Sequence, residues 1–555
     1  MRLKQLLTST VIVVSLFADT KEDVKQSEEF YQKSLQKLLN VETEIKADVG
    51  SRSGERDMLL SEVPIDVVTS QQIRQSGSKE LSQILQRYIP GFNFPRPSVA
   101  DGSDHVKPFT LRGLNPDQVL VLINGKRLHQ SSLMNINATI GRGTSSVDLN
   151  TIPVASIERV EVLRDGAAAQ YGSDAIAGVI NIILKGYGHK NEATASYAQT
   201  KKGDGRTKQA DLFYSIPLEY DGFFNITTEF RDKGATNRAG ADTRDQYPSG
   251  DLRNELPDSV NMHYGDTDTQ NKFLMLNSEV VTRSGAVFYM HGLYNDRQSE
   301  SGAFFRRSID SRNNVNIYPD GFLPMIAPKI EDYSLSIGVK DMLKNEIKWD
   351  LSFTHGFNDY RFFVYNTLND SLGDESQTSF DSGGTKYTQN ILNLDLSKKI
   401  DKLYLSGGIE LRKENYSIYS GEETSYMLGT FSDNAGAQGF PGFQPSNEVD
   451  ESRKNTALYL DAKYSFSKDA VFGLASRYEN YSDFGSTFNT KLSMIYKPVK
   501  ELLFRTTASS GFRAPSLSQS YYTATTTGRS GDELYQTGTF AVNHPVAKAL
   551  GAVEL

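Results

Sequence analysis

The chain has 555 residues, more than one ordinary domain needs, and a formal net charge of −8. This acidic balance argues against nucleic acid as a partner, because phosphate binding requires a surplus of clustered Lys and Arg. The sequence contains no cysteine, which excludes disulfides, thiol catalysis and Cys-ligated metals.

Residues 1–18 have the layout of a secretory signal peptide. Arg2 and Lys4 precede an apolar run that ends at Phe17, and the small residue Ala18 follows. The alternative is a buried N-terminal helix or strand. Residues 19–51 are predicted to form a periplasmic leader. Because no later segment offers the roughly 20 apolar residues of a spanning helix, an exported chain is either a soluble protein or an outer-membrane barrel.

Residues 52–186 have the pattern of a compact α+β unit. A strand-like segment over 63–69 precedes a helical stretch over 70–88, which ends before Pro90 and Gly91. Residues 119–128 place two apolar runs around an Asn-Gly turn, which predicts a β-hairpin. Two further strands are predicted over 156–166 and 177–186.

Residues 187–555 alternate polar and apolar side chains, as in 347–354, where every second residue is apolar. The joins between these segments alternate as well. Tight turns are predicted near 217–222, 282–284, 343–346, 398–402, 467–470 and 498–500, and the joins between them include long loops near 232–268, 297–330, 359–384 and 420–452. One rim of short turns and an opposite rim of long loops are typical of outer-membrane β-barrels. A soluble β-sandwich is the alternative, although four long loops on one side would be unusual for it.

The alternating region holds about 13 predicted strands between residues 190 and 513. An open sheet edge in lipid would leave backbone groups unpaired, so a barrel has to close, usually with an even strand number. We therefore expect the sequence to be the N-terminal part of a longer protein whose barrel is incomplete here.

Several stretches resemble the TonB-dependent outer-membrane receptors. FTLRGL (109–114), VLVLINGKRL (119–128) and IERVEVLRDGAAAQYGSDAIAGVINIILK (157–185) resemble their plug domain, and 407–419, 476–498 and 509–519 resemble their barrel. The resemblance implies a membrane β-barrel of about 22 antiparallel, up-and-down strands with the N-terminal α+β plug domain inside its lumen. The matching plug residues are Leu111, Gly113, Asn124, Gly125, Glu158, Arg159, Glu161, Gly166, Tyr171, Gly172, Gly178 and Asn181.

The resemblance also implies a latch between plug and barrel. Arg112 and Arg164 match plug arginines that the family sets against glutamates of the barrel wall. Period-two alternation places Glu410 and Glu414 on the lumen face of their strand, opposite an apolar face, so these two are the predicted partners. The alternative is a set of solvated lumen charges without plug partners.

A TonB box, the short segment that pairs as an added strand with TonB, is expected just before the plug. Residues at this position alternate in the way an edge-pairing strand requires, and the alternative is a plain linker. The predicted box consists of Glu44, Ile45, Lys46, Ala47, Asp48 and Val49.

The resemblance implies high-affinity uptake of a scarce, bulky nutrient, driven through TonB, ExbB and ExbD. Ferric siderophores are the expected substrates, with cobalamin, haem or glycans as alternatives. A passive porin would lack a plug, and a secreted β-rich enzyme or adhesin would show a catalytic cluster or repeats. No cofactor is predicted, and no metal site, because no pair of histidines has ligand spacing. His105 and His129 are expected to be ordinary polar loop residues, the alternative being contact with a haem-like ligand.

Overall fold

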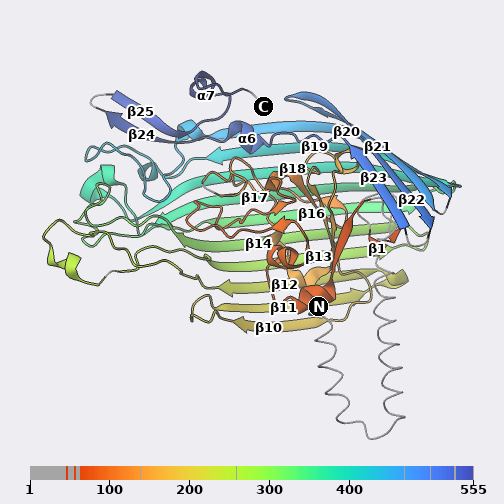
Figure 1. The fold of residues 1–555 in the computed structure, drawn as a ribbon, viewed down its shortest axis with the longest axis horizontal. Helices are drawn as coiled ribbons and strands as arrows, with labels where there is room; N and C mark the ends of the chain where they lie inside the picture. The colour runs from red at the N-terminus through yellow and green to blue at the C-terminus, as the bar shows by residue number, and fades with distance from the viewer. Residues whose placement is uncertain are drawn as a thin grey trace, which may run out of the picture.

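The computed structural model describes residues 46–47, 56–57, 63–137, 139–257, 259–467, 469–499, 502–530 and 533–553. A large curved antiparallel sheet wraps around a smaller α+β domain, which lies inside the curve (Figure 1). The predicted signal peptide, and Glu44, Ile45, Asp48 and Val49 of the predicted TonB box, lie outside the described residues. Within the described part of the chain, no helix has the length and apolar character needed to cross a membrane.

The inner domain, called the plug below, is built on a five-stranded sheet in the order β3-β8-β9-β6-β7, in which β6 and β9 run parallel. Its apolar core includes Ile84 and Leu85, which are fully buried. Preceding it is the short pair β1 (Lys46–Ala47) and β2 (Arg56–Asp57). The plug elements are β3 (Ile65–Thr69), α3 (Ser70–Gln75), α4 (Leu81–Tyr88), β4 (Phe92–Asn93), β5 (Thr110–Leu111), β6 (Val119–Ile123), β7 (Lys126–Arg127), β8 (Ile157–Leu163), α5 (Ala168–Tyr171) and β9 (Gly178–Leu184).

The single helix expected over 70–88 is two helices, α3 and α4, in the structure. Thr69 and Gln72 form a capping box that starts α3, with Thr69 Oγ1 accepting from the Gln72 backbone N–H at 3.3 Å. Gly77 then adopts a φ of +70°, a left-handed conformation that ends the helical path. The sequence-based expectation missed this break because the apolar spacing continues across it.

The outer sheet has 14 strands, of which β15 has only two residues, and the other thirteen agree with the expected number. All its strand pairs are antiparallel, which confirms the predicted meander. Its strands are β10 (Glu192–Ala198), β11 (Thr207–Pro217), β12 (Phe223–Lys233), β13 (Asp268–Val281), β14 (Val287–Gly302), β15 (Met325–Ile326), β16 (Lys329–Met342), β17 (Lys348–Tyr365), β18 (Ser379–Ile400), β19 (Leu403–Tyr419), β20 (Val449–Ser467), β21 (Ala470–Tyr481), β22 (Gly485–Val499) and β23 (Leu502–Ser509). Beyond it lie α6 (Leu517–Tyr521), the hairpin β24 (Ala524–Ser530) and β25 (Glu533–Thr539), and α7 (Pro545–Ala549).

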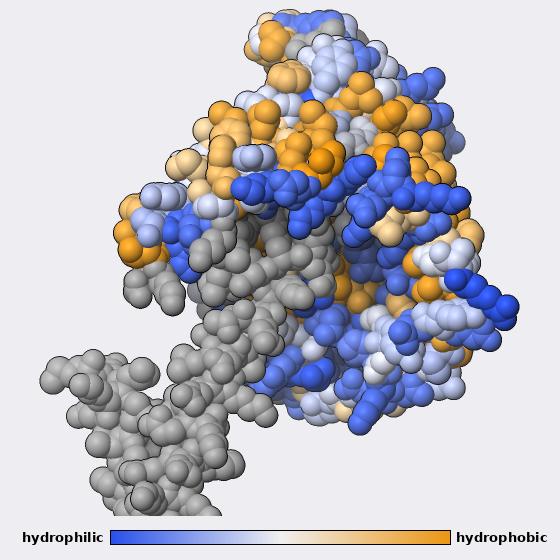
Figure 2. All heavy atoms as spheres, turned by 90° about the vertical axis from the view of Figure 1, so that its right-hand side faces the viewer, coloured by the Kyte–Doolittle hydropathy of each residue, from blue (hydrophilic) through white to orange (hydrophobic). Residues whose placement is uncertain are grey.

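Side chains of the outer sheet alternate between a polar inner face and an apolar outer face. In β17, Ser352 and Thr354 are 3% and 5% exposed, whereas Leu351 and Phe353 are 41% and 40% exposed. The exposed apolar side chains suit a lipid environment, in which polar groups are costly. Figure 2, a view onto the end with the short turns, shows hydrophobic residues on part of the outer flank and hydrophilic residues around the opening.

The two rims of the sheet differ as the sequence predicts. Short connections such as 282–286 and 343–347 lie at the right of Figure 1, and the long loops gather at its left. The longest of these loops are 234–267, 303–324 and 420–448. The loop expected over 359–384 spans only 366–378, because β17 and β18 continue beyond a bulge near Arg361 and Phe363.

Candidate functional site

Two plug glycines stand where no side chain fits. A Cβ on Gly178 would lie 2.2 Å from the Leu163 carbonyl oxygen, and the residue has a φ of +154°. Gly172 has a φ of +93°, and a Cβ there would lie 3.0 Å from the Arg477 guanidinium of β21. These positions therefore fix two close approaches, one of β9 to β8 and one of the plug to the barrel wall.

Several other motif residues form a hydrogen-bonded network within the plug. Arg159 Nε donates to Glu161 at 2.8 Å, and Glu161 accepts from the Asn181 amide at 3.3 Å. The Asn181 side-chain oxygen in turn accepts from the Gly125 backbone N–H at 3.0 Å, so the network ends at the turn between β6 and β7. Asn124 and Gly125 have φ values of +47° and +78°, which this tight turn requires.

The remaining plug residues that match the family motif also occupy defined structural positions. Leu111 is fully buried in the plug core, and Tyr171 packs in a second apolar cluster of the plug. Glu158 lies 3.2 Å from His189 at the end of the plug. Gly113 adopts a φ of +76°, and Gly166 provides a carbonyl oxygen that accepts from Lys491 at 2.8 Å.

The turn between β6 and β7 reaches the barrel wall at its tip. Lys126 Nζ lies 3.1 Å from Asp350 of β17 and 3.6 Å from Asp395 of β18. Tyr289 of β14 donates to Asp350 at 2.6 Å, and the Asn124 amide donates to Asn277 of β13 at 3.2 Å. Residues 124–126, called the hairpin tip below, are thus bound to three neighbouring regions of the wall.

Two cavities flank the hairpin tip at the rim with the short turns. The first has a volume of about 670 Å³ and is lined by Lys126, Trp349, Asp395 and the turn at 284–285. The second has a volume of about 490 Å³ and extends along β12 to β14. Residues 124–126 line both cavities, so the hairpin tip lies between them.

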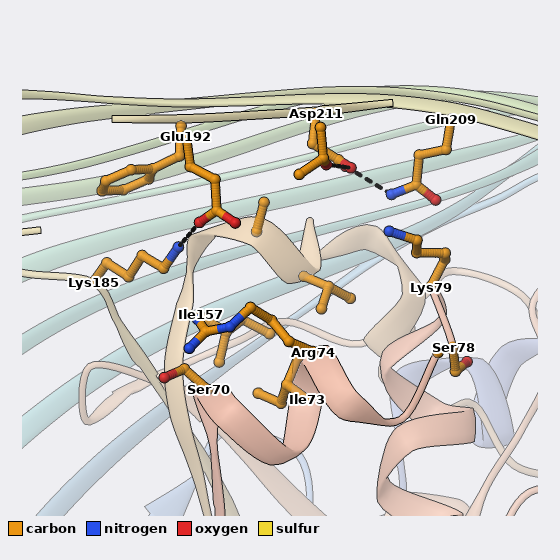
Figure 3. A pocket seen from close by; sticks show the side chains of 15 residues that line it. Ser70, Ile73, Arg74, Ser78, Lys79, Ile157, Lys185, Glu192, Gln209 and Asp211 are labelled. Atoms are coloured by element: carbon orange, nitrogen blue, oxygen red, sulfur yellow. Dashed lines mark hydrogen bonds and ion pairs between the residues drawn. The ribbon is translucent and has the colours of Figure 1, made fainter. Parts of the chain in front are cut away.

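A smaller cavity of about 170 Å³ lies between the first plug helix and the first strands of the barrel (Figure 3). Lys185 reaches Glu192 of β10 at 3.4 Å, and the Gln209 amide donates to Asp211 within β11 at 2.7 Å. Ser70 and Arg74 of α3 form its opposite side. Lys185, Glu192 and Asp211 are thus engaged with neighbours at this boundary between plug and wall, where Arg74 and Lys79 also line the cavity.

The prediction that Arg112 and Arg164 of the plug pair with glutamates of the barrel wall is wrong. Arg164 forms its ion pair with Asp66 inside the plug, and the Arg112 side chain is exposed, with one hydrogen bond to the Ala177 carbonyl at 3.4 Å. Among the residues that the structure describes, no ion pair joins either arginine to Glu410 or Glu414. Arg112 follows the short strand β5 directly and has a φ of +58°.

The two glutamates do lie on the lumen face, as the alternation predicts. Glu410 is 5% exposed and forms an ion pair of 3.1 Å with Arg477 of β21. Glu414 accepts a hydrogen bond from Tyr387 at 2.6 Å. Arg412 lies between them, 4.0 and 3.9 Å from the two carboxylates. The cations in ion-pair contact with these glutamates, Arg412 and Arg477, therefore belong to the wall itself.

The plug touches Arg412, Arg477 and Tyr481 through small residues, and its Arg127 also interacts electrostatically with Glu410. Gly172 lies against Arg477, and the Ser173 hydroxyl accepts from Tyr481 at 3.0 Å and from Arg412 at 3.4 Å. Sequence alternation could have placed these wall residues in the lumen. It could not have indicated which plug segment meets them.

The plug histidines are buried contacts with the wall, which sequence reasoning treated as ordinary loop residues. His105 lies 2.6 Å from Ser299 and 3.1 Å from Ser301 of β14, and burial lowers its pKa below the usual value. His129 lies 3.3 Å from Asp332 of β16. Close to His105, Arg297 forms an ion pair of 2.6 Å with Asp148 of the plug.

Of the predicted TonB box, only Lys46 and Ala47 are described. They form β1, which pairs antiparallel with β2 through Lys46↔Asp57 and Ala47↔Arg56. The Ala47 side chain is fully buried in a cluster that includes Leu120 and Leu122 of β6. The segment therefore packs on the strand that leads to the hairpin tip.

The long loops close over the plug at the opposite rim. Phe440, in the loop 420–448, stacks on Phe362 of β17 with ring centroids 4.0 Å apart, and Phe443 packs edge-on against Tyr522. Arg306 of the neighbouring loop donates to Gln438 at 3.0 Å. These contacts form an aromatic cap, defined here as Phe362, Phe440, Phe443 and Tyr522, over the lumen.

Two family models match the chain. The TonB-dependent receptor plug domain matches residues 59–179, and the TonB-dependent receptor-like β-barrel matches residues 283–543. The vitamin B12 transporter BtuB of Photobacterium profundum is 25% identical over 469 residues, which cover 83% of this chain and 60% of that protein. The ferric enterobactin receptor PirA of Pseudomonas aeruginosa is 30% identical over 198 residues, which cover 35% of this chain and 26% of that protein.

Solved structures support the same fold. A variant of the ferric enterobactin receptor PfeA from Pseudomonas aeruginosa superposes with a TM-score of 0.60 at 15% identity, covering 82% of this chain and 63% of that chain. The siderophore receptor PirA from Acinetobacter baumannii gives a TM-score of 0.55 at 16% identity, covering 81% and 61%. The chain thus spans less than two thirds of the length of these relatives. With a plug domain, a lipid-suited barrel and both family models matched, the chain belongs to the TonB-dependent receptors of the outer membrane.

Proposed function

We propose that the protein captures a scarce, bulky nutrient at the cell surface and imports it into the periplasm with energy delivered through TonB, ExbB and ExbD. The observation that carries the proposal is the plug in the lumen, which meets the wall on several sides. Lys126 pairs with Asp350 of β17, and Asp165 pairs with Lys491 of β22 at 2.9 Å. A passive porin needs an open, water-filled lumen, so this plug favours an energised carrier.

The proposed contact with TonB is residues 44–49. A segment that already pairs as a short strand, at Lys46 and Ala47, can exchange that pairing for a strand of another protein. Ala47 lies buried against the plug in this structure, so engagement by TonB requires that it leave this site. Binding of the ligand at the opposite rim would favour that release, in an order–disorder type of switch.

The proposed substrate is a ferric siderophore. This assignment follows the relatives named as receptors for ferric enterobactin. Cobalamin is the second candidate, because the match to BtuB extends over 83% of this chain. The exposed apolar side chains of the outer face make outer-membrane lipid the surrounding medium.

Uptake assays distinguish these substrates. Cells that lack the receptor, with and without a plasmid copy, are given radiolabelled ferric enterobactin or radiolabelled cyanocobalamin. We expect receptor-dependent accumulation of the iron complex, abolished by a protonophore or by deletion of TonB. Accumulation of cyanocobalamin alone would support the second candidate. Uptake that continues without TonB would reject the energised carrier.

A further inference from the structure

Two lysines lie directly opposite each other on the outer face of the barrel wall. Lys413 of β19 and Lys454 of the neighbouring strand β20 are partners in the strand register, and both are exposed. Their sequence neighbours Arg412 and Asn455 are 4% and 2% exposed and face the lumen. Alternation therefore places both lysines, called the lysine pair below, on the lipid side. Like charges directly opposite each other destabilise a sheet, and an anion between them would relieve the repulsion.

The carboxylates of the protein leave the lysine pair without a counter-charge. Within the described part of the chain, no ion pair includes either lysine. The carboxylate on the outer face of β19 and β20 is Asp450, which accepts from the Asn415 amide at 2.8 Å and lies four residues from Lys454 along β20. By contrast, Lys386 on the same face lies 3.6 Å from Asp359. The partner that the lysine pair lacks is therefore an anion from outside the protein.

An apolar surface, called the apolar track below, continues from the lysine pair toward the short turns. Its exposed side chains, which are between 41% and 56% accessible, are Ile409, Leu411, Leu458 and Leu460. Gly407 lies opposite Leu460 in the register and has no side chain, so the row of side chains on β19 is interrupted there. A flexible acyl chain can follow such an uneven apolar surface more closely than a flat one.

The lysine pair lies at the long-loop edge of the apolar band. On β19, the outer face carries no charged residue from Leu403, beside the short turn, to Leu411. The strand from Leu403 to Lys413 rises by about 3.3 Å per residue, and with a tilt of about 40° it spans roughly 25 Å in height. This is about the height of the apolar band of outer-membrane barrels. The two ammonium groups therefore lie at the level of the headgroups of the outer leaflet.

A phosphate group suits this position. Lysine binds phosphate as a point charge, and two flexible stems that start from opposite positions can bring both ammonium groups to one phosphate. A phosphate in solution would have to be drawn from water to an exposed site. A lipid phosphate is already held at this depth, because its acyl chains lie in the apolar band. Charge and depth together favour a lipid over a free anion.

We propose that the lysine pair binds a phosphate of an outer-leaflet glycolipid whose acyl chains lie along the apolar track. The bound phosphate neutralises the two facing cations and holds one lipid molecule against β19 and β20. The proposal requires only the outer-membrane location of the barrel. It does not depend on the nutrient that is imported or on the energy source.

The test uses the purified full-length receptor in detergent, titrated with lipid A that carries two phosphates. Native mass spectrometry measures the bound fraction. The test variant is Lys413→Gln with Lys454→Gln, and Lys413→Arg with Lys454→Arg keeps both charges. The matched control is Lys208→Gln with Lys272→Gln, which removes two exposed lysines that lie opposite aspartates in the strand register. Unfolding temperatures without lipid show whether each variant is folded, and the glutamine variant should unfold no earlier than the native protein.

We expect the glutamine variant to bind lipid A at least tenfold more weakly, since each lysine beside an anionic headgroup contributes a factor of about five. The arginine variant and the control should stay within about twofold of the native affinity. Native affinity in the glutamine variant, or an equal loss in the control, would overturn the proposal. Equally tight binding of lipid A without phosphates would show a purely apolar contact and would reject it as well. Displacement of lipid A by inorganic phosphate at equal concentration would identify a site for a free anion instead.

Discussion

Lys126 at the tip of the plug hairpin and Asp350 in barrel strand β17 form an ion pair of 3.1 Å, although 224 positions separate them in the sequence. The pair joins the plug to the wall beside a cavity that the short turn at 284–285 also lines. It is also the contact at which plug and barrel are separated by the largest cavities described above.

Replacement of Lys126 by Met should make the receptor leak. The change removes the attraction of Lys126 to Asp350 and Asp395, so the tip should separate from the wall more readily. Stability should fall by roughly 1–3 kcal/mol, between the values for exposed and fully buried pairs, because Lys126 is largely buried whereas water reaches both carboxylates. Conductance in planar bilayers measures the effect. Lys340→Met is the matched control, because Lys340 lines the same cavities but pairs with Glu279 of the wall at 2.6 Å. Equal conductance of the two variants would contradict the role of the tip.

Replacement of Arg477 by Met should destabilise the barrel strongly. The guanidinium is fully buried between Glu410 and Glu479, at 3.1 Å from each, so its loss removes the nearest cation from two buried carboxylates. Breaking a buried pair costs about 3–5 kcal/mol, measured as the free energy of unfolding in detergent. Arg361→Met is the control, since Arg361 pairs with Asp381 but is 49% exposed. Its loss should cost less than about 1 kcal/mol. A similar cost for both would show that burial of these charges is unimportant.

Replacement of Ala47 by Pro should abolish uptake and leave surface binding of ligand intact. Proline removes the backbone N–H that strand pairing with TonB would use. Ala47→Gly keeps this donor and serves as the control, with uptake expected within a factor of a few of the native level. Radiolabelled ferric enterobactin gives both readouts. Native uptake by the proline variant would place the TonB contact elsewhere.

Acidification should weaken the contact between the plug and β14. Burial lowers the pKa of His105, so the folded protein favours the neutral imidazole between Ser299 and Ser301. The resulting stability is fully present above about pH 6.5, the usual value, and is lost as the pH falls below it. Unfolding temperatures at pH 7.5 and pH 5 should differ less for His105→Gln than for the native protein. His544→Gln, at the start of α7, should keep the native pH dependence.

Trypsin added to intact cells should cut the connection between β12 and β13. Its Arg244 and Arg253 side chains are 51% and 46% exposed, and long loops face the outside of outer-membrane barrels. Lys344, in the short turn between β16 and β17, should be cut only after the outer membrane is permeabilised. Cleavage at Lys344 in intact cells would reverse the topology.

The sequence pattern predicts which face of a strand a residue occupies, but not its depth or its neighbours. Alternation correctly placed Glu410 in the lumen. Its cation could not be deduced, because Arg477 lies two strands away, and register depends on how the strands are offset. Asp350 is a similar case, since period two places it in line with Ser352 and Thr354. Its pairing with Lys126 depends on how deeply the plug is seated.

Other differences arise where one local feature overrides a pattern. The apolar spacing over 70–88 is that of one helix, yet Gly77 interrupts it with a left-handed conformation. Arg112 matches a motif arginine, yet its backbone has a φ of +58° and its side chain donates to the Ala177 carbonyl within the plug. Motif glycines such as Gly178 were predictable as close approaches, because glycine alone permits them.

The unequal rims have a consequence for how the barrel is assembled. A chain delivered from the periplasm must carry loops such as 234–267 and 420–448 through the bilayer before its strands can close. Each backbone group that crosses hydrocarbon unpaired costs several kcal/mol, and these loops have dozens. Spontaneous insertion through an intact bilayer would therefore be exceedingly slow.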